Sequence, residues 1–471
     1  MNNNVVCSPN RIEAIRITVH GKRRVGGISI SRNELEIRTE RDNFGEADIP
    51  IKALYGIQTW RTAQNLSFSG QLLKDYPEYI VSLAMVKKAA ALANLEAGKL
   101  APSIGNAIVN ACDQLIQGKH HDQFIVDVLH GGGGIGTNMN VNEVLANLAN
   151  ETLTGTIGTQ SPIHPIDHVN ASQSTSDVCH TAIRLAIVSC YERLDRELTK
   201  MNDMMRKKSQ QFMGITTISR TCLQDALRVR LGDVFSGYAS VLKRRQDSLE
   251  GSVVSLLTVN LGATVIGNGV GASKEYKEAV IGKLRDVTDK NVTIRDNLFD
   301  AAQNIDDLAH MSTQLSLMAT SLIKVAKDLR LLSSGPEAGF SEIILPSVQA
   351  GSSFFPGKVN PVIPETMIQS CFQVLGCDRV VQAALEHGEL DLNVFEGMAG
   401  INILNGLYML ANSAESFTRL CLNGMASNEE RCRELANTFI PVITELRERL
   451  GYSAVSKLLG EEDREFIKNL L

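Results

Sequence analysis

The sequence predicts a mainly helical protein, all-α in class, with a bundle of long helices at its centre. Four long segments, 176–211, 225–249, 304–332 and 364–389, repeat apolar and charged residues at close to the helical period. Hydrophobic residues make up 44% of the 471-residue chain, but aromatic residues only 5%. A large core of aliphatic side chains and alanine is therefore expected, and it suits close packing of helices. Extended antiparallel helices in a bundle explain this combination best.

The other elements follow around this bundle in chain order. Near the N-terminus, alternating residues predict short strands or an extended arm at 15–19, 28–30 and 34–38. Helical patterns precede and follow the bundle at 80–100, 105–117, 140–150, 429–439 and 442–450. We therefore expect three domains: an N-terminal domain with a short extended arm (1–176), a central helical bundle (177–425) and a small helical C-terminal domain (426–471).

Composition excludes several classes of partner. The formal net charge is −5 and the sequence pI about 6.0, with no long basic run, so nucleic-acid binding is not expected. The nine cysteines are dispersed without CxxC pairs, which favours reduced thiols and a cytoplasmic location. No apolar run is long enough to span a membrane, and the N-terminus lacks the pattern of a secretory signal.

The segment 351–361, GSSFFPGKVNP, carries the strongest chemical signal. Pro356, Gly357 and Pro361 interrupt both helix and strand, so a flexible loop is expected. This loop places a serine near a lysine point charge and an asparagine amide donor. The alternative is a plain polar surface loop, since glycine and serine clusters commonly mark such loops.

Three further stretches are dense in small polar residues: 131–140, 167–177 and 219–225. The first fits GxGxxG formally, but no strand–turn–helix unit surrounds it, and a phosphate loop would need a following lysine and hydroxyl. Each stretch alone could simply cap a helix. Together they supply hydroxyl and amide donors at several helix N-termini, where anions are favoured. A carboxylate substrate is the simplest ligand for such a set.

The loop resembles the mobile loop of the aspartase/fumarase superfamily, whose pattern is Gly-Ser-Ser-x-x-Pro-x-Lys-x-Asn-Pro. Further stretches that resemble sequence motifs of the family are found at 53–59, 137–143, 167–177, 262–269 and 390–396. The sequence of residues 358–365 resembles the aspartase-like branch most closely. The resemblance implies a homotetramer around a central helix bundle, with each active site assembled from three subunits. It also implies a small-molecule carboxylate substrate, and chemistry without a metal ion or an organic cofactor.

The resemblance also implies roles for individual residues. Ser352 would be the base that removes a proton from the carbon β to the leaving group, provided that its neighbours stabilise the alkoxide. The substrate carboxylate at the leaving-group carbon would be held by Lys358, Asn360 and Thr221. The group that absorbs the carbanion charge would meet Ser174, Thr175 and Ser353. Two residues of the first family region, Thr137 and Asn138, complete the expected substrate-binding set.

The sequence departs from the aspartase pattern where the departing amine is held. The matching positions are Ile135, Ser176 and Cys222, and none of them keeps the family's ammonium contact. Ile135 has no polar side-chain group and Cys222 only a weak donor. A fumarase-type histidine is also missing at 222, so we expect Glu365 to be a helix N-terminal or ion-pair residue rather than half of a catalytic His–Glu pair.

Aromatic residues appear near the same pocket, at Trp60, Phe354 and Phe355. They could pack as core, or they could offer π faces to a quaternary ammonium, which needs no hydrogen bonds. We therefore predict a carbon–nitrogen lyase whose leaving group is trimethylamine, resembling the ergothionases (ergothioneine trimethylamine-lyases). Elimination of ammonia from aspartate, or of an amine from an N-substituted aspartate, is the alternative reaction. An inactive structural or binding homologue is the alternative of another class.

Overall fold

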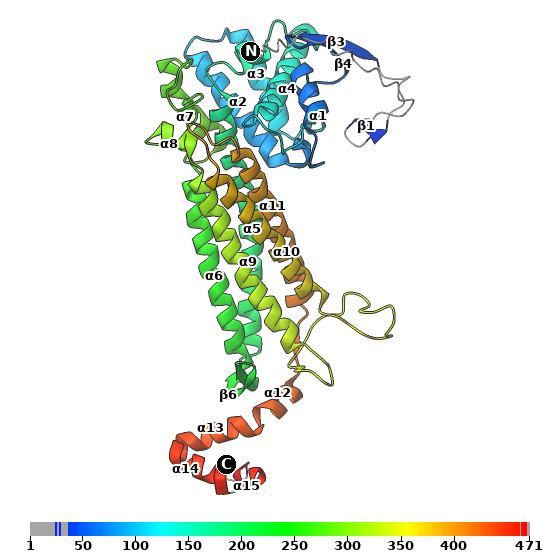
Figure 1. Ribbon diagram of the computed structural model, residues 1–471, viewed down its shortest axis with the longest axis vertical. Helices are drawn as coiled ribbons and strands as arrows, with labels where there is room; N and C mark the ends of the chain where they lie inside the picture. Colours follow the sequence, from blue (N-terminus) through cyan, green and yellow to red (C-terminus); the bar gives the residue numbers. More distant parts are fainter. Residues whose placement is uncertain (1–23, 26–27, 30–35, 462, 469–471) are drawn as a thin grey trace, which may run out of the picture. The chain divides into compact units, whose positions relative to one another are not determined.

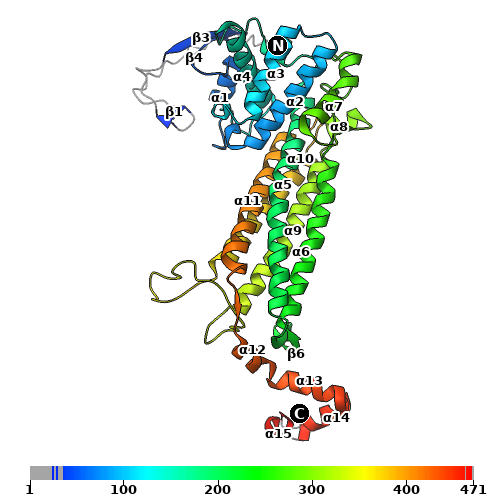
Figure 2. The same cartoon turned by 180° about the vertical axis from the view of Figure 1, so that it is seen from behind.

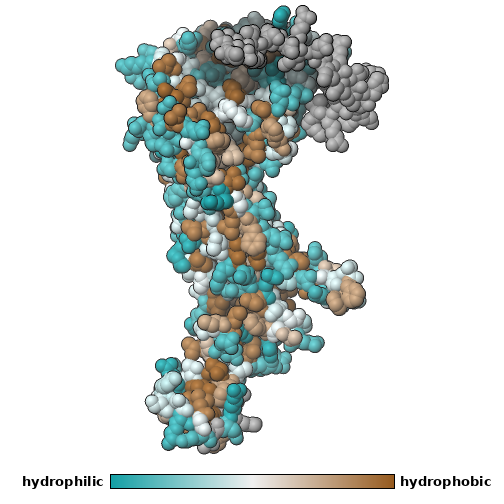
Figure 3. Space-filling model, viewed as in Figure 1, coloured by the Kyte–Doolittle hydropathy of each residue, from teal (hydrophilic) through white to brown (hydrophobic). Residues whose placement is uncertain are grey.

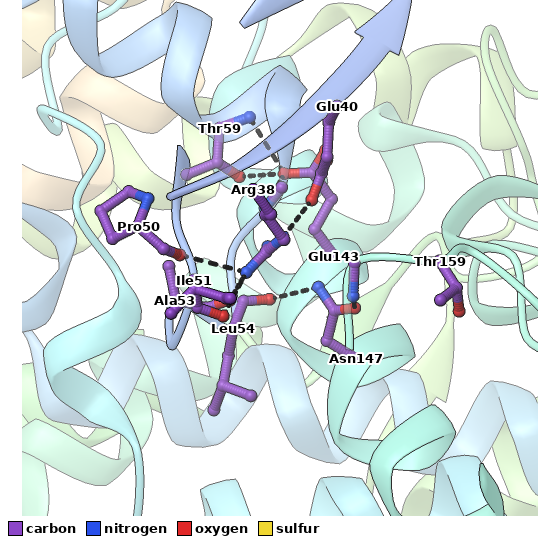
Figure 4. Close-up of polar contacts among 12 residues, drawn as sticks. Arg38, Glu40, Pro50, Ile51, Ala53, Leu54, Thr59, Glu143, Asn147 and Thr159 are labelled. Atoms are coloured by element: carbon purple, nitrogen blue, oxygen red, sulfur yellow. Dashed lines mark hydrogen bonds and ion pairs between the residues drawn. The ribbon is translucent and has the colours of Figure 1, made fainter. Parts of the chain in front are cut away.

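The computed structural model describes residues 24–25, 28–29, 36–461 and 463–468, and it divides into two compact units, Met1–Ala53 and Leu54–Leu471. In the first unit, β1 (Arg24–Val25) pairs with β2 (Ile28–Ser29) and β3 (Ile37–Asp42) pairs with β4 (Gly45–Pro50), both antiparallel. Arg38 donates to the carbonyl oxygens of Ile51 at 3.0 Å and Ala53 at 2.7 Å, which fixes the chain after β4 (Figure 4). The strand predicted at 15–19 lies outside the described residues.

The second unit begins with four helices that lie at one end of the long bundle (Figure 1). They are α1 (Ile57–Asn65), α2 (Pro77–Glu96), α3 (Pro102–Ile116) and α4 (Ile135–Thr154). Proline stands at the first position of α2 and of α3, where its missing N–H costs nothing. Alanine-rich α2 packs against α3, α5 and α7, as small side chains permit.

Five long helices form the central bundle (Figures 1 and 2). They are α5 (Thr175–Gln211), α6 (Leu231–Ser255), α9 (Asp306–Leu332), α10 (Val362–Glu386) and α11 (Glu396–Phe417). Each packs on the next in the closed order α5, α6, α9, α10, α11 and back to α5. The 37 residues of α5 give it a length of about 55 Å. The predicted mainly helical fold with a central long-helix bundle is confirmed.

One bundle helix starts later than the sequence predicts. The helical pattern was expected from residue 225, but α6 begins at Leu231. The intervening residues form β6 (Gln224–Arg230), which pairs antiparallel with β5 (Thr216–Thr221). Thr216, Thr217 and Ile218 are β-branched, and pairing with this strand satisfies the backbone groups of β6 that a helix would otherwise satisfy internally.

Shorter elements complete the second unit. The helices are α7 (Lys274–Thr288), α8 (Leu298–Gln303), α12 (Glu429–Ala436), α13 (Phe439–Leu450), α14 (Tyr452–Glu461) and α15 (Arg464–Lys468), with short helical turns at Leu73–Asp75, His121–Gln123, Pro165–Val169 and Thr418–Leu422. The strand pairs are β7 (Thr258–Val259) with β8 (Thr293–Ile294), parallel, and β9 (Ile343–Ile344) with β10 (Ala426–Ser427), antiparallel. The helices α12 and α13 contact the β5–β6 hairpin. The three-domain division at 176 and 425 stays a prediction.

Side chains of both kinds cover the bundle. Figure 3 shows hydrophobic residues exposed among polar ones along its visible face. Phe372 of α10 and Leu331 of α9 are among the exposed large apolar residues. Across the described residues, no helix has the combination of length and hydropathy that a membrane span requires.

Candidate active site

The loop that carries Ser352 lies between β9 and α10, and its backbone is folded around the serine hydroxyl. Ser352 Oγ accepts hydrogen bonds from the N–H groups of Phe354 and Phe355, both at 2.9 Å. The two aromatic rings meet edge to face at 4.9 Å, and Phe354 is 80% exposed. Two backbone donors aimed at one oxygen stabilise negative charge on it, which is the environment that a serine base requires.

Hydrogen bonds across its neck close the loop. Gly351 N–H donates to the carbonyl of Lys358 at 2.7 Å, and the Asn360 amide donates to the carbonyl of Gly351 at 2.7 Å. A Cβ on Gly351 would lie 2.6 Å from the Lys358 carbonyl oxygen, so only glycine fits there. Lys358 Nζ lies 5.8 Å from the Phe355 ring centroid, and Ser353 is exposed. The loop therefore presents Ser352, Ser353 and Lys358 together.

The β5–β6 hairpin carries the next predicted pair. Its two-residue turn consists of Cys222 and Leu223, whose φ angles are 53° and 60°. Glycine and asparagine favour this left-handed turn, so two other residues there carry conformational strain. Thr221 and Cys222 are both exposed at this tip.

A cavity of about 250 Å³ lies at the other end of the bundle, where α4 and α5 begin. Its walls include the backbone of Gly131–Gly134, Thr137 of α4, and Ser176 and Cys179 of α5. Gly134 has φ 91°, and a Cβ there would lie 3.1 Å from Cys179 Sγ, so the glycine run can approach α5 closely. Two predicted site residues, Thr137 and Ser176, therefore line one cavity.

His130 also lines this cavity and was not predicted. The Thr137 N–H donates to His130 Nε2 at 3.0 Å, which places the proton of a neutral ring on Nδ1. A Cβ on Gly136 would lie 2.5 Å from the ring and 2.6 Å from Thr62, so this glycine makes room for the histidine. Burial lowers the pKa of His130, although the charge of Asp127 opposes this. Its position directly before the glycine run was the available sequence signal.

A buried polar network lies next to the cavity residues. Asn138 donates to Thr175 Oγ1 and to Asn170 Oδ1, both at 3.0 Å. The same Asn170 oxygen accepts from Lys87 Nζ at 2.8 Å. Burial lowers the pKa of Lys87 to about 7, although nearby Cys179 and Asp177 raise it. Asn138 and Thr175 are therefore bound to each other in this structure.

Ser174 caps α5. Its hydroxyl accepts from Ser176 N–H at 3.3 Å, and its own N–H donates to Asp177 Oδ1 at 2.8 Å. Asp177 Oδ2 accepts from the N–H groups of Gly262 at 3.0 Å and Thr264 at 3.1 Å. Burial raises the pKa of Asp177 to about 6, and these backbone donors oppose the shift. The family motif at 262–269 thus stabilises the start of α5 through hydrogen bonds to Asp177.

The remaining predicted residues lie apart from the cavity walls. Ile135 is 47% exposed, and Trp60 stacks on Tyr55 with ring centroids 6.4 Å apart. Glu143 holds the start of α1 near Trp60 by accepting from Thr59 Oγ1 at 2.6 Å and from Thr59 N–H at 3.0 Å (Figure 4).

Glu365 lies in the first turn of α10, where its carboxylate favours the positive end of the helix. Its Oε1 is 3.2 Å from Arg330 Nη2, and the two side chains are partly exposed, at 42% for Arg330 and 39% for Glu365. This position is compatible with the predicted ion-pair role.

The predicted residues form three separate clusters within one chain. The loop of Ser352 precedes α10, and the cavity wall at 392–396 follows it, so the length of α10 separates them by about 37 Å. Ser176 lies in the first turn of α5 and Thr221 lies beyond its other end, so the length of α5 separates them by about 55 Å. Figures 1 and 2 both show α4 and β6 at opposite ends of the bundle. One chain alone therefore does not bring Ser352 to the cavity.

Charged groups stand behind the cavity wall formed by the start of α11. Glu396 lines the cavity and pairs with His180 Nδ1 at 2.8 Å and with Arg184. Arg184 also binds Asp307 with two nitrogens, at 2.7 and 2.8 Å. Arg295 Nη2 is 2.8 Å from the same Asp307. Within the described ranges, no group of three or more histidine, cysteine, aspartate or glutamate residues is arranged to hold a metal ion.

Comparisons with known proteins agree with this architecture. A family profile described as "lyase" matches residues 45–376. The aspartate ammonia-lyase of a Bacillus species is 42% identical over 426 residues, covering 90% of this chain and 91% of that protein. The aspartate ammonia-lyase of Escherichia coli strain K12 is 39% identical over 429 residues, with 90% of each protein covered.

Solved structures agree as well. The cobalt-bound fumarate lyase:delta crystallin from Brucella melitensis superimposes with a TM-score of 0.88 at 41% identity, covering 92% of this chain and 95% of that one. A class II fumarase from Schistosoma mansoni gives a TM-score of 0.87 at 31% identity, covering 90% and 92%. The chain belongs to this lyase family, the aspartase/fumarase superfamily. Its activity is that of a carbon–nitrogen lyase.

Proposed function

We propose that the protein eliminates an amine from a carboxylate substrate by anti β-elimination, with Ser352 as the base. Ser352 Oγ takes the proton from the carbon β to the leaving group, and the electron pair of that C–H bond forms the double bond as the C–N bond breaks. The two N–H donors on Ser352 Oγ support this role. Lys358 and Asn360 on the same loop, with Thr221, would hold the carboxylate next to the breaking C–N bond.

We also propose that the protein works as a homotetramer with composite active sites. The cavity end of one chain would meet the Ser352 loop and the β5–β6 hairpin of two other copies. The reason is the distance that α5 and α10 impose between these clusters within a single chain. Exposed apolar residues on the bundle, such as Phe372, supply surface that association would cover.

For the leaving group we favour trimethylamine, with the betaine ergothioneine as substrate and thiourocanate as product. The residue types at Ile135, Ser176 and Cys222 carry this choice, because an ammonium ion would lose most of its hydrogen-bond partners there. Trimethylamine leaves as a neutral molecule with the C–N electron pair, so it needs no acid beside it. The thione-bearing ring would take the place of a second carboxylate as electron sink.

Deamination of aspartate to fumarate and ammonia is the second candidate. The aspartate ammonia-lyases that are 42% and 39% identical to this chain support this reaction rather than the ergothionase one. Ser174, Thr175 and Ser353 also match positions that meet a second carboxylate in aspartases. The relatives therefore favour aspartate, whereas the residues at the amine positions favour an alkylated amine.

A parallel assay decides between the two substrates. The protein is incubated separately with ergothioneine, with aspartate, and with fumarate plus ammonia, while released amine and ultraviolet absorbance are followed. We expect trimethylamine and a conjugated product from ergothioneine only. The variant Ile135→Thr/Ser176→Asn/Cys222→His, which restores polar side chains at the amine positions, should lose trimethylamine release and gain ammonia release from aspartate. Efficient deamination of aspartate by the unmodified protein, with ergothioneine untouched, would overturn this choice in favour of the second candidate.

A further inference from the structure

The cavity where α4 and α5 begin is lined mainly by apolar and aromatic residues, yet one ionised side chain is part of its wall. Tyr79, Phe395, Met398 and Ile401 contribute apolar or aromatic surface to its walls. Glu396 is the one acidic or strongly basic residue among the described residues that line it. A single carboxylate in such a wall is expensive to bury unless its charge has a partner.

The position of the Glu396 carboxylate leaves one of its oxygens available. His180 Nδ1 and Arg184 Nη1 both donate to Oε1. Within the described part of the chain, Oε2 has no hydrogen-bond partner, and the side chain keeps 13% of its surface exposed. Glu396 is also one of the residues that line the cavity.

The surrounding charges keep Glu396 ionised without cancelling it. Burial would raise its pKa, but His180 and Arg184 lower the pKa overall. Burial and Arg184 lower the pKa of His180, so this histidine is neutral and donates from Nδ1. Arg184 already faces Asp307 with two of its nitrogens. Arg184 and Arg295 face three carboxylates, those of Asp300, Asp307 and Glu396, so two positive charges do not fully balance this cluster.

These features define the kind of ligand that fits. Ammonium needs several hydrogen-bond acceptors, whereas a quaternary alkylammonium needs none and is attracted to aromatic faces and to a nearby carboxylate. Tyr79 and Phe395 are aromatic residues in the wall of the same cavity as Glu396. We propose that Glu396 is the counter-ion of an alkylated ammonium group, and that this cavity is the binding pocket for the amine that leaves the substrate. This inference rests on the proposed elimination and names a residue that determines its substrate class.

Binding experiments test the pocket without turnover. Titration calorimetry compares choline with 3,3-dimethyl-1-butanol, which has the same shape but no charge. We expect the unmodified protein to bind choline at least tenfold more tightly than the neutral analogue. Glu396→Gln, which keeps the side-chain shape, should weaken choline binding about tenfold and leave the neutral analogue unaffected. Equal affinity of the unmodified protein for both molecules would overturn the proposal even if the variant fails to fold.

Asp307→Asn is the matched control. It alters the same charge cluster on the side of Arg184 away from the cavity, so a folded variant should keep the preference for choline. If Asp307→Asn and Glu396→Gln lose this preference equally, Glu396 only supports the fold and the inference fails.

Turnover measurements separate the proposed reaction from the proposed pocket. If choline binding depends on Glu396 but ergothioneine releases no trimethylamine, the proposal that ergothioneine is the substrate fails and the proposed ammonium pocket stands. If Glu396→Gln releases trimethylamine with an unchanged KM, the proposed reaction stands and the counter-ion role of Glu396 is excluded.

Discussion

The two ends of the helix bundle differ in how far one chain completes them. At one end, α4, α5 and the start of α11 enclose a cavity, and polar groups next to it bond to one another, as Asn138 and Thr175 do. At the other end, Ser352 and Thr221 lie on a loop and a hairpin tip with few neighbours, and Phe354 is 80% exposed.

Under the proposed mechanism, this difference separates substrate binding from proton removal. The cavity end supplies walls and a charge arrangement for the amine. The loop end supplies the proposed base, Ser352, and the cation of Lys358. The proposed site needs both ends, and the length of the helices prevents one chain from joining them.

Replacing the proposed base should have the largest effect. Ser352→Ala should lower turnover by roughly 10²–10⁴-fold, the usual contribution of a general base. The melting temperature should stay unchanged, because the hydrogen bonds of Ser352 Oγ within the described part of the chain come only from backbone N–H groups of its own loop. Initial rates and a thermal melt measure both quantities. Ser353→Ala is the neighbouring control and should be affected less, while an undiminished rate in Ser352→Ala would exclude this residue as base.

Mixing experiments test whether the two ends meet between copies. Ser352→Ala and Thr137→Val, each expected to be inactive, are unfolded together, refolded and assayed. If each site takes its loop and its cavity from different chains, roughly a quarter of the activity should return.

Ser352→Ala mixed with Lys358→Ala is the control. Both changes lie on the same loop, so no site would receive an intact loop and no activity should return. Absence of rescue in the first mixture, with assembly shown by light scattering, would contradict a composite site.

The cavity end should show a pH-dependent stability that Lys87 controls. Because burial lowers the pKa of Lys87 from 10.5 to about 7, the unfolded chain holds a proton between these values that the folded chain has released. Stability therefore rises with pH across this window and is lowest below it, where the buried ammonium is charged. Relative to Lys87→Met, the unmodified protein should gain on the order of 2 kcal/mol between pH 7 and pH 9. Denaturant unfolding at both values measures this, and a constant difference would contradict the shift.

The smallest effect is expected at the exposed end, for Glu365→Gln. Its ion pair with Arg330 is partly exposed to solvent, so stability should change by less than about 1 kcal/mol. Turnover should stay within tenfold of the unmodified protein, since no histidine stands at position 222 to form a catalytic pair. A loss of several orders of magnitude with an intact fold would assign Glu365 to the chemistry.

The sequence by itself determined the features that depend on local spacing. The helical period predicted the bundle, and Pro356, Gly357 and Pro361 predicted the loop that presents Ser352. The resemblance of residues 351–361 to the family loop then suggested roles for individual residues, and these roles remain predictions. All of these signals lie within short stretches of the chain.

Only the tertiary structure decided the features that depend on distant contacts. Pairing with β5 turned residues 224–230 from an expected helix start into a strand. Tyr79, His130 and Glu396 come from three distant parts of the chain and share one cavity only because α2, α4 and α11 pack around α5. The charge state of Glu396 likewise depends on burial and on Arg184, which no local pattern records.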